Sequence, residues 1–445
     1  MRNSVLKMLP LVLLFCVSAY AASAPQDEQI KRGEYLAIAG DCGACHTDSG
    51  KPDFSGGHAI VSPIGTIYST NITPSKTDGI GRYTLEQFSD ALRKGKRADG
   101  SPLYPAMPYT AYAKLNDEDV SALYAYFMHG VAPVDQRPQA TELPFPFNLR
   151  FSMAAWNLLF LDKETFKPQD DRSEEWNRGA YLVQGLGHCS TCHTPRNFLM
   201  AEQQDKLLGG ASLGTWFAPD ITARQLTDTH WTREMLTEYL ATGYADNGAT
   251  AGGPMLEAID KSFSRLTPED RQAIAQYLLP EDAKSVVKPV TSGLTPVTGN
   301  DTPAALDAMS EGQKLYLGNC AACHNQEGQG LNGLPALKNH PILQKPTADN
   351  VAMAILDGVW PEKGQGMPGF AHELSDAQIA SLTNYLMKDV GGSHISLTSE
   401  RVKELRNGGA ASPLLMLARV GMIAGAVIVI LIIGIWLYRR RRKTA

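Results

Sequence analysis

The chain has 445 residues, of which 43% are hydrophobic and 20% are charged. At roughly 100 to 200 residues per domain, this length predicts two to four domains, and the composition excludes a chain that is disordered throughout. The 41 basic and 46 acidic residues give a net charge of -5, so the chain lacks the basic surplus of a nucleic-acid-binding protein.

The first 24 residues have the pattern of an export signal. A basic start precedes a largely apolar run from Met8 to Val17, and Ala19-Tyr20-Ala21 has the small-x-small form of a cleavage site. A retained N-terminal anchor is the alternative, and it would need a longer apolar run. We predict a signal peptide over residues 1–24, which carries one of the seven cysteines, Cys16, away with it.

The six remaining cysteines form three copies of C-x-x-C-H, the attachment signature of a c-type haem. The copies are Cys42-Gly-Ala-Cys45-His46, Cys189-Ser-Thr-Cys192-His193 and Cys320-Ala-Ala-Cys323-His324. In this motif two thiols become thioethers to the haem, and the adjoining imidazole becomes an iron ligand. A disulfide framework does not explain the histidines, a zinc site needs four ligands in one place, and a thioredoxin-like pair needs a βαβ setting. We predict three covalently bound haems c, with His46, His193 and His324 as axial ligands.

The sequence around the motifs repeats as well. Before the motifs stand Arg32-Gly33-Glu-Tyr35-Leu36, Arg178-Gly179-Ala-Tyr181-Leu182 and Gly312-Gln-Lys-Leu315-Tyr316. Each repeat closes with a helix that has a clear start signal, namely Asn116 with Asp119, Thr267 with Asp270, and Ser375 with Gln378. Repeats one and two share an insertion, residues 65–73 and 214–222, which the third lacks. The first two repeats are therefore interpreted as two copies of a larger type of domain, and the third as a smaller one.

A six-coordinate electron-transfer haem needs a second axial ligand, and in cytochromes c this is usually methionine. Three methionines recur in one context, a Gly/Pro-rich loop before the closing helix, and we predict them as the distal ligands in chain order: Met107, Met255 and Met367. Methionines in helices are assigned to the core: Met128, Met353 and Met387. Histidines that do not recur are expected to have ordinary surface or core roles: His58, His188, His230, His340 and His372.

The segment between the first two repeats is too apolar for a plain spacer, since residues 145–161 hold four phenylalanines and a tryptophan. One interpretation is that the segment packs across both repeats. The other is a docking surface for a partner subunit or the bilayer interface.

The C-terminal region predicts a membrane span. Val420 to Tyr438 is 19 residues without a charge, which as a helix rises about 28 Å and matches the bilayer core. Five consecutive bases, Arg439 to Lys443, follow and favour a cytoplasmic end by the positive-inside rule. A buried core helix is the alternative, and these terminal bases argue against it. We expect a single span in the bacterial inner membrane, with the haem domains in the periplasm.

These observations predict a mainly α fold, with three tandem class I cytochrome c domains and a C-terminal transmembrane helix. The expected boundaries are a signal peptide at 1–24, the first domain at 25–131, a linker at 132–172, the second domain at 173–282, a linker at 283–303, the third domain at 304–391, a linker at 392–413, the transmembrane helix at 414–438 and a cytoplasmic tail at 439–445.

The chain resembles the three-haem cytochrome c subunits of bacterial membrane-bound dehydrogenases, which serve quinoprotein alcohol dehydrogenase and flavin-dependent gluconate, sorbitol or fructose dehydrogenases. The resemblance covers nearly the whole mature chain and rests on the three haem motifs, Asn71-Ile-Thr-Pro with Gly79-Ile-Gly81, Met107-Pro108-Tyr109, Phe147-Asn with Trp156-Asn-Leu-Leu, and Trp360-Pro with Gly366-Met367-Pro368. It implies a catalytic partner that is flavin- or PQQ-dependent, with or without a small third subunit. It also implies that ubiquinone accepts the electrons.

We therefore expect a non-catalytic redox subunit that passes electrons from a dehydrogenase to ubiquinone. The sequence shows no nucleophile triad, phosphate loop or metal cluster. Two alternatives stay open. A haem enzyme of the peroxidase or thiosulfate dehydrogenase type would leave one iron without its methionine, and a stand-alone carrier to a terminal oxidase would have no catalytic partner.

Overall fold

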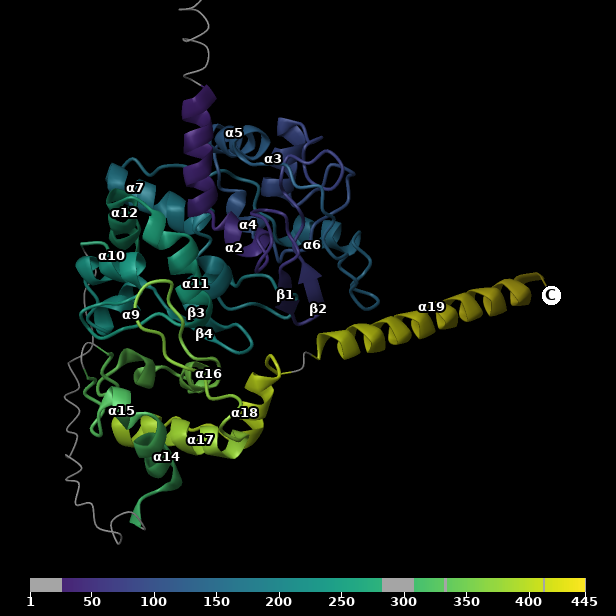
Figure 1. The fold of residues 1–445 in the computed structure, drawn as a ribbon. Coiled ribbons are helices and arrows are strands. Elements are labelled where there is room, and N and C mark those ends of the chain that lie inside the picture. The colour runs from purple at the N-terminus through teal and green to yellow at the C-terminus, as the bar shows by residue number, and fades with distance from the viewer. Residues whose placement is uncertain (1–25, 282–307, 332–333, 411–412, 445) are drawn as a thin grey trace, which may run out of the picture.

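A computed structural model describes residues 26–281, 308–331, 334–410 and 413–444 (Figure 1). The predicted signal peptide and the linker at 283–303 lie outside these described residues. Helices dominate the fold. The first and second repeats form one body, the third repeat lies beside it, and a single long helix, α19, projects away from both (Figure 1).

The first repeat begins with a helix over residues 26–39. Its other elements are α2 (Cys42–His46), the antiparallel pair β1 (Ala59–Ser62) and β2 (Gly65–Tyr68), α3 (Leu85–Lys94), α4 (Tyr109–Tyr112), α5 (Asp117–Ala125) and the π-helical turn η1 (Tyr126–Gly130). The shared insertion therefore supplies the second strand of a β-hairpin, in which Tyr68 pairs with Ala59.

The second repeat also runs from a first helix through a motif turn and a β-hairpin to a closing helix, but it has additional short elements and its π-helical turn follows the first helix. Its elements are α7 (Glu174–Tyr181), the π-helical turn η2 (Leu182–Leu186), α8 (Ser190–His193), η3 (Gln204–Lys206), the antiparallel pair β3 (Gly209–Ser212) and β4 (Phe217–Asp220), α9 (Ala223–Asp228), α10 (Arg233–Thr242), α11 (Gly253–Lys261), η4 (Phe263–Arg265) and α12 (Pro268–Leu278). The prediction that Met255 lies in a loop is wrong, because Met255 lies in the first turn of α11, next to Pro254. Proline is tolerated there because the first N–H groups of a helix have no intrahelical acceptor.

The third repeat is smaller. Its elements are α14 (Glu311–Asn319), α15 (Ala321–His324), η5 (Pro341–Gln344), α16 (Asp349–Asp357), α17 (Asp376–Tyr385) and the π-helical turn η6 (Leu386–Val390). Among its described residues there is no β-hairpin, only the isolated bridge between Val359 and Met367. Two further helices follow, α18 (Ser399–Arg406) and α19 (Leu414–Thr444).

The three closing helices begin where the sequence predicts. A side-chain oxygen of the residue before each helix accepts a hydrogen bond from the backbone N–H three residues later, at Asn116, Thr267 and Ser375. The last of these forms a complete capping box with Gln378. Each such cap stabilises its helix by about 1 kcal/mol.

Each repeat has a glycine in the helix before its motif, at the point where that helix crosses the closing helix. A Cβ added at the glycine of the helix before each motif would lie 2.0, 1.8 and 2.3 Å from a backbone oxygen of the closing helix, for the pairs Gly33 with Ala122, Gly179 with Ala273, and Gly312 with Ser381. No real Cβ approaches so closely. Glycine at this position therefore lets the two helix backbones touch and places each C-x-x-C-H motif against the repeat's core.

The first and second repeats share one hydrophobic core. A single cluster of buried side chains contains Leu115 and Leu123 from the first repeat and Leu182, Leu186 and Ile274 from the second. The third repeat has its own cluster, centred on α16 and α17. The first two repeats are thus packed as one body, and the third is a separate body beside it.

Reciprocal hydrogen bonds join the first two repeats. The Tyr35 hydroxyl donates to Asp270 Oδ2 at 2.6 Å, and the Tyr181 hydroxyl donates to Asp119 Oδ2 at 2.6 Å. Each tyrosine lies before a haem motif, and each carboxylate lies in the closing helix of the other repeat. The joint therefore has an approximate twofold symmetry, as expected for a duplicated unit.

Each of these carboxylates also binds an arginine of its own repeat. Arg178 Nε and Nη2 donate to the two oxygens of Asp270, both at 2.7 Å, and Arg32 binds Asp119 at 2.6 Å. Burial alone would raise the pKa of Asp270, but the hydrogen bonds from Arg178 and Tyr35 outweigh it and hold that pKa below its ordinary value. Asp270 is therefore an ionised acceptor at the joint.

The segment between the first two repeats contains α6 (Ser152–Phe160) and contacts both of them. The Tyr109 hydroxyl donates to Asn157 Oδ1 at 2.7 Å, and the Trp156 indole N–H donates to the Leu199 carbonyl oxygen at 2.9 Å. These hydrogen bonds support the interpretation that the segment packs across both repeats. No residue of α6 is buried, so its other face is free for further contacts.

Among the described residues, α19 is the one helix long and apolar enough to cross a membrane, over Leu414–Arg442. None of the most apolar stretch of this span is buried against the rest of the protein. By length and composition, α19 fits the span predicted from the sequence.

Candidate haem-attachment sites

Each C-x-x-C-H motif lies on a short helical turn, α2, α8 or α15, directly after the first helix of its repeat. In the first two repeats the residue before the first cysteine has a positive φ, 51° at Asp41 and 36° at His188, which turns the chain sharply out of that helix. None of the six cysteines is paired with another in a disulfide. The described residues therefore do not form the disulfide framework considered as an alternative.

The motif histidines share a hydrogen bond that the sequence does not reveal. In each, Nδ1 lies within hydrogen-bond distance of a main-chain carbonyl oxygen: 2.6 Å for His46 with Thr70, 2.7 Å for His193 with Pro219, and 3.0 Å for His324 with Pro335. A carbonyl oxygen can only accept, so Nδ1 carries the proton and Nε2 keeps its lone pair. This is the tautomer and the restraint that a metal-ligating imidazole needs.

Burial also favours neutral imidazoles at two of these sites. It lowers the pKa of His46 and of His193, and in His193 this outweighs the opposing hydrogen bond to Pro219. A neutral ring with a free Nε2 is the form that binds iron.

The insertion in the first two repeats supplies these carbonyl groups. Thr70 follows β2 by two residues, and Pro219 lies within β4 at the equivalent place. The next residue in each case, Asn71 or Asp220, accepts hydrogen bonds through Oδ1 from a threonine two residues later. The β-hairpin and this turn therefore hold the carbonyl oxygen against the histidine.

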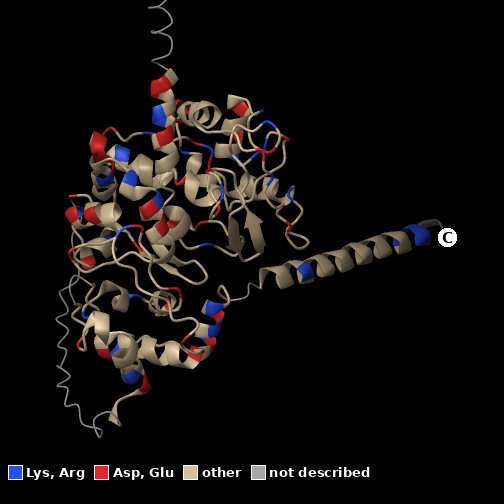
Figure 2. Ribbon diagram, in the orientation of Figure 1, with Lys and Arg blue, Asp and Glu red and all other residues tan. Residues whose placement is uncertain are grey.

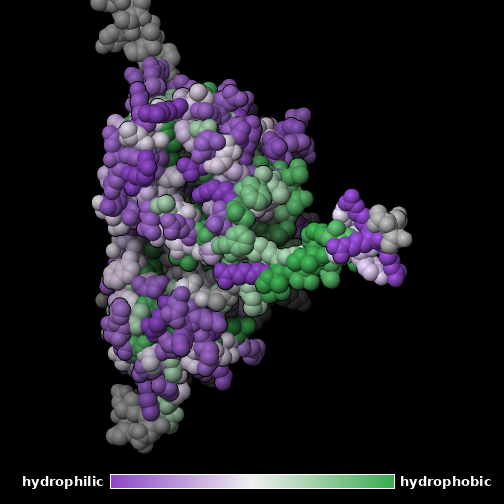
Figure 3. All heavy atoms as spheres, turned by 90° about the vertical axis from the view of Figure 1, so that its right-hand side faces the viewer, coloured by the Kyte–Doolittle hydropathy of each residue, from purple (hydrophilic) through white to green (hydrophobic). Residues whose placement is uncertain are grey.

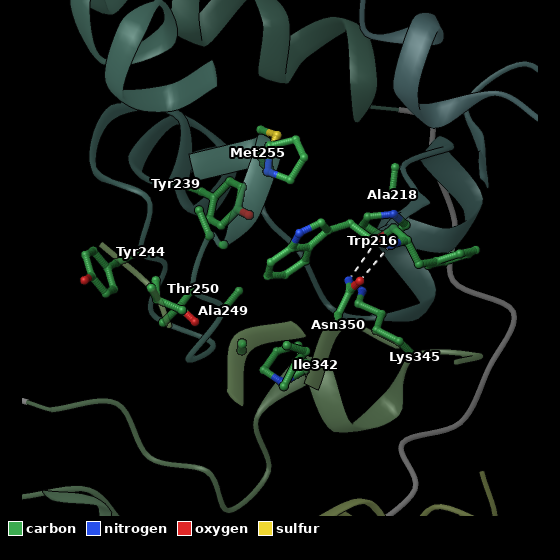
Figure 4. A pocket seen from close by; sticks show the side chains of 18 of the residues that line it. Trp216, Ala218, Tyr239, Tyr244, Ala249, Thr250, Met255, Ile342, Lys345 and Asn350 are labelled. Atoms are coloured by element: carbon green, nitrogen blue, oxygen red, sulfur yellow. Dashed lines mark hydrogen bonds between the residues drawn. The ribbon is translucent and has the colours of Figure 1, made fainter. Parts of the chain in front are cut away.

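A cavity of about 410 Å³ lies between the second and third repeats (Figure 4). Two complete sets of predicted site residues line it: Cys189, Cys192, His193 and Met255 from the second repeat, and Cys320, Cys323, His324 and Met367 from the third. The structure thus brings together the predicted ligands of the second site and those of the third in the lining of one largely apolar cavity.

These two sets fit haem c. Each offers two thiols for attachment, an imidazole nitrogen and a thioether sulfur, which are the donors of a six-coordinate c-type haem. The remaining lining is largely apolar, including Leu226, Phe263 and Ile355. Such a lining excludes water from a porphyrin and suits its hydrophobic faces.

At the first site, Cys42 and Met107 both pack against the core that the first two repeats share. His46 repeats the hydrogen-bond pattern of the other two motif histidines. The other helical methionines behave as assigned, because Met353 and Met387 are buried in the core of the third repeat and Met128 packs against the shared core.

His340 has a structural role, as expected for a histidine that does not recur. It lines the cavity, but Nδ1 accepts from the Ile342 backbone N–H at 3.1 Å, and Nε2 lies 3.1 Å from Thr250 Oγ1. Burial lowers its pKa to about 4. Both ring nitrogens are therefore used by the protein, and neither is left for iron.

Two cavity residues were missed by sequence reasoning. The Trp216 side chain projects between the second and third repeats, next to Gly253 (Figure 4). Lys345 is a partly buried residue on the wall, and burial lowers its pKa despite the opposing charge of Asp220. No pattern in the sequence singles out either residue.

Three repeated attachment motifs, each with a restrained imidazole, define a cytochrome of the c type. The sequence model of the cytochrome c family matches residues 30–130 and 309–388. The fructose dehydrogenase cytochrome subunit of Gluconobacter japonicus is 41% identical, with 93% of this chain and 91% of that protein aligned. The chain belongs to the family of cytochrome c subunits of dehydrogenases.

Two further relatives have comparable coverage. The gluconate 2-dehydrogenase cytochrome c subunit of Pantoea cypripedii is 38% identical, over 91% of this chain and 95% of that protein. The cytochrome c subunit of the quinone-type alcohol dehydrogenase of Gluconobacter oxydans is 37% identical, over 91% of this chain and 88% of that protein. The resemblance found in the sequence is therefore confirmed, and the chain is an electron-transfer subunit.

Proposed function

We propose that this chain holds three covalently bound haems c and passes electrons from a catalytic dehydrogenase subunit to ubiquinone. The catalytic partner would be a flavin- or PQQ-dependent enzyme that oxidises an alcohol, a sugar or a sugar acid. Relatives named for fructose, gluconate and alcohol dehydrogenases support this range of partners.

The observation that carries the proposal is the cavity lined by two complete sets of thiols, imidazole and thioether. Haem iron, once bound, supplies one-electron transfer between its ferrous and ferric forms. The chain's own residues attach the porphyrin through cysteines, present Nε2 of His46, His193 and His324, and exclude water. Met107, Met255 and Met367 would supply the second axial donors.

We also propose the wider organisation of the protein. Residues 25–131, 173–282 and 304–391 would be three tandem class I cytochrome c domains in the periplasm. The helix α19 would anchor them in the bacterial inner membrane, with Arg439 to Lys443 on the cytoplasmic side. The candidate span at Leu414–Arg442 and the run of bases after it support this orientation.

The mass of the mature protein tests the number of haems. We expect three additions of porphyrin mass, and two in a Cys189→Ala/Cys192→Ala variant. Fewer than three additions in the unaltered protein would overturn the proposal.

Axial ligation is tested one methionine at a time. Replacing Met107, Met255 or Met367 with histidine should lower the reduction potential of a single haem, because the thioether ligand raises it. Met353→Leu is the matched control, since Met353 is buried in the core and should leave all potentials unchanged. A high-spin ferric haem in the unaltered protein would instead favour a haem enzyme.

Co-purification tests the partner. Solubilisation in mild detergent should yield a stoichiometric dehydrogenase subunit, and its substrate should drive reduction of a ubiquinone analogue. Purification of the cytochrome alone, without any flavin- or PQQ-containing subunit, would favour a stand-alone carrier.

A further inference from the structure

An exposed apolar surface lies on the first two repeats, formed by α6 and its flanks together with the tip of the first hairpin. We call it the apolar ledge, and it consists of Val61, Phe145, Phe151, Leu158, Leu159 and Phe198. The side chains are strongly exposed, 84% at Leu158, 74% at Val61 and 78% at Phe198. Contiguous exposed apolar surface of this kind marks an interaction site in a folded protein.

The ledge carries almost no charge. Neither α6 nor the two strands β1 and β2 contain a charged residue. The ribbon of α6 and of the β1–β2 hairpin is tan, whereas acidic and basic residues crowd the helices elsewhere in the same body (Figure 2). The nearest charges along the chain, Arg150 and Asp162, lie just outside α6, so burying the ledge side chains themselves would place no charge in an apolar medium.

The ledge faces the side of the body from which α19 departs. The view from that side shows hydrophobic atoms gathered over the body and continuing toward the projecting helix (Figure 3). In Figure 1, α6 and the β1–β2 hairpin likewise lie on the side toward α19. The ledge and the candidate span thus point the same way.

The tether between the body and α19 is short. Salt bridges fix α18 to the third repeat, with Arg401 bound to Asp349 at 2.8 Å and Arg406 to Asp376 at 2.8 Å. Only residues 407–413 separate the end of α18 from the start of α19. An extended chain of this length reaches about 25 to 30 Å, so the body cannot move far from a bilayer that holds α19.

We propose that the apolar ledge inserts into the surface of the same membrane that holds α19, as a second and shallow attachment. This inference rests on the proposed membrane anchoring. The ledge side chains would enter the boundary between headgroups and acyl chains, about 5 to 10 Å deep. Two attachment points would fix the orientation of the three haem sites relative to the bilayer, which a single helix on a short tether does not.

Vesicle binding by the protein without α19 tests the proposal. A chain ending at residue 410 keeps both hydrophobic cores, because neither contains a residue of α19. We expect it to sediment with neutral phosphatidylcholine vesicles, which offer no electrostatic attraction. Leu158→Glu should lower its partitioning at least about tenfold, and adding Leu159→Glu should lower it further.

The matched control is Leu85→Glu, the same substitution at an exposed leucine on α3, outside the ledge. It should leave vesicle binding unchanged. Haem content and the visible spectrum should be the same in all variants, which establishes that they fold. Failure of the truncated protein to bind vesicles, or equal losses in Leu85→Glu and Leu158→Glu, would overturn the proposal.

The catalytic subunit is the competing occupant. If Leu158→Glu/Leu159→Glu in the full chain abolishes co-purification of the dehydrogenase, and the truncated protein does not bind vesicles, the ledge is a subunit interface and the membrane proposal is wrong. Failure of the proposed function would look different. It would appear as missing haems or as the absence of any dehydrogenase in the unaltered protein.

Discussion

The joint between the first and second repeats differs from the joint between the second and third. The first joint is filled by side chains that form one core, and it is closed by the paired bonds of Tyr35 to Asp270 and Tyr181 to Asp119. The second joint encloses the cavity of about 410 Å³ and is held at its rim by polar contacts. These include the Asn350 side chain with the Phe217 backbone.

The difference indicates what each joint depends on. The first joint is closed by packed side chains, and Cys42 and Cys189 of the attachment motifs pack against the same core. The second joint is hollow, and a close-packed interface forms there only when something fills the hollow. The position of the third repeat should therefore depend more strongly on the haem proposed for it than the pairing of the first two repeats depends on theirs.

The largest expected effect comes from emptying the second joint. A Cys320→Ala/Cys323→Ala variant should lose one haem and loosen the contact between α16 and the β3–β4 hairpin. Amide hydrogen exchange in both elements should accelerate at least about tenfold, while α12 at the first joint stays protected. Equal acceleration in α12 would show that the two joints do not differ.

A buried carboxylate at the first joint should matter more than any ion pair at the surface. Asp270→Ala leaves Arg178 and Tyr35 without their acceptor and should destabilise the joined repeats by about 2 to 3 kcal/mol, less than for a fully buried pair because Arg178 is partly exposed. Thermal unfolding measures the loss. The control is Glu281→Ala, which removes the exposed partner of Arg233 and should cost less than about 1 kcal/mol.

Much of the molecule could be predicted from the sequence, because the signals are local or repeated. The C-x-x-C-H motifs predict which residues would hold a haem, since covalent attachment leaves little freedom in their placement. The helix starts at Asn116, Thr267 and Ser375 were predicted correctly, because a cap is a short-range hydrogen bond. The apolar segment around α6 was recognised from its composition alone.

Long-range pairing could not be predicted. Arg32, Tyr35 and Asp119 belong to recurring patterns, but nothing in those patterns shows that the tyrosine crosses to the other repeat. The carbonyl groups that restrain the motif histidines belong to the main chain, so no residue type marks them. Met255 was placed in a loop because Pro254 precedes it, although proline is equally suited to a helix start.

The symmetry of the first joint can be tested with two matched substitutions. Each tyrosine hydroxyl donates to a carboxylate and accepts from a backbone N–H, at Thr267 for Tyr35 and at Asn116 for Tyr181. Tyr35→Phe and Tyr181→Phe should therefore cost similar amounts, about 1 to 2 kcal/mol each, measured by thermal unfolding. A large cost at one site and none at the other would contradict the twofold arrangement.

The smallest expected effect lies at the rim of the second joint. Asn350 binds both the N–H and the carbonyl group of Phe217, at 2.7 and 2.8 Å, and Asn350→Ala should cost about 1 kcal/mol because water can replace these partly exposed bonds. Exchange in α16 and in the β3–β4 hairpin should accelerate about fivefold. Asn384 makes the same pair of bonds to Leu397, in the segment after the third repeat, so Asn384→Ala is a matched control that should leave the hairpin unchanged.

Combining Asn350→Ala with Cys320→Ala/Cys323→Ala separates the contribution of the rim from that of the filled cavity. If the joint is already open without the third haem, the added substitution should accelerate exchange in the β3–β4 hairpin no further, because the bond it removes is no longer formed. A full fivefold acceleration in the combined variant would mean that Asn350 still holds the joint closed around an empty cavity. The protein contacts at the rim, rather than the haem, would then determine where the third repeat lies.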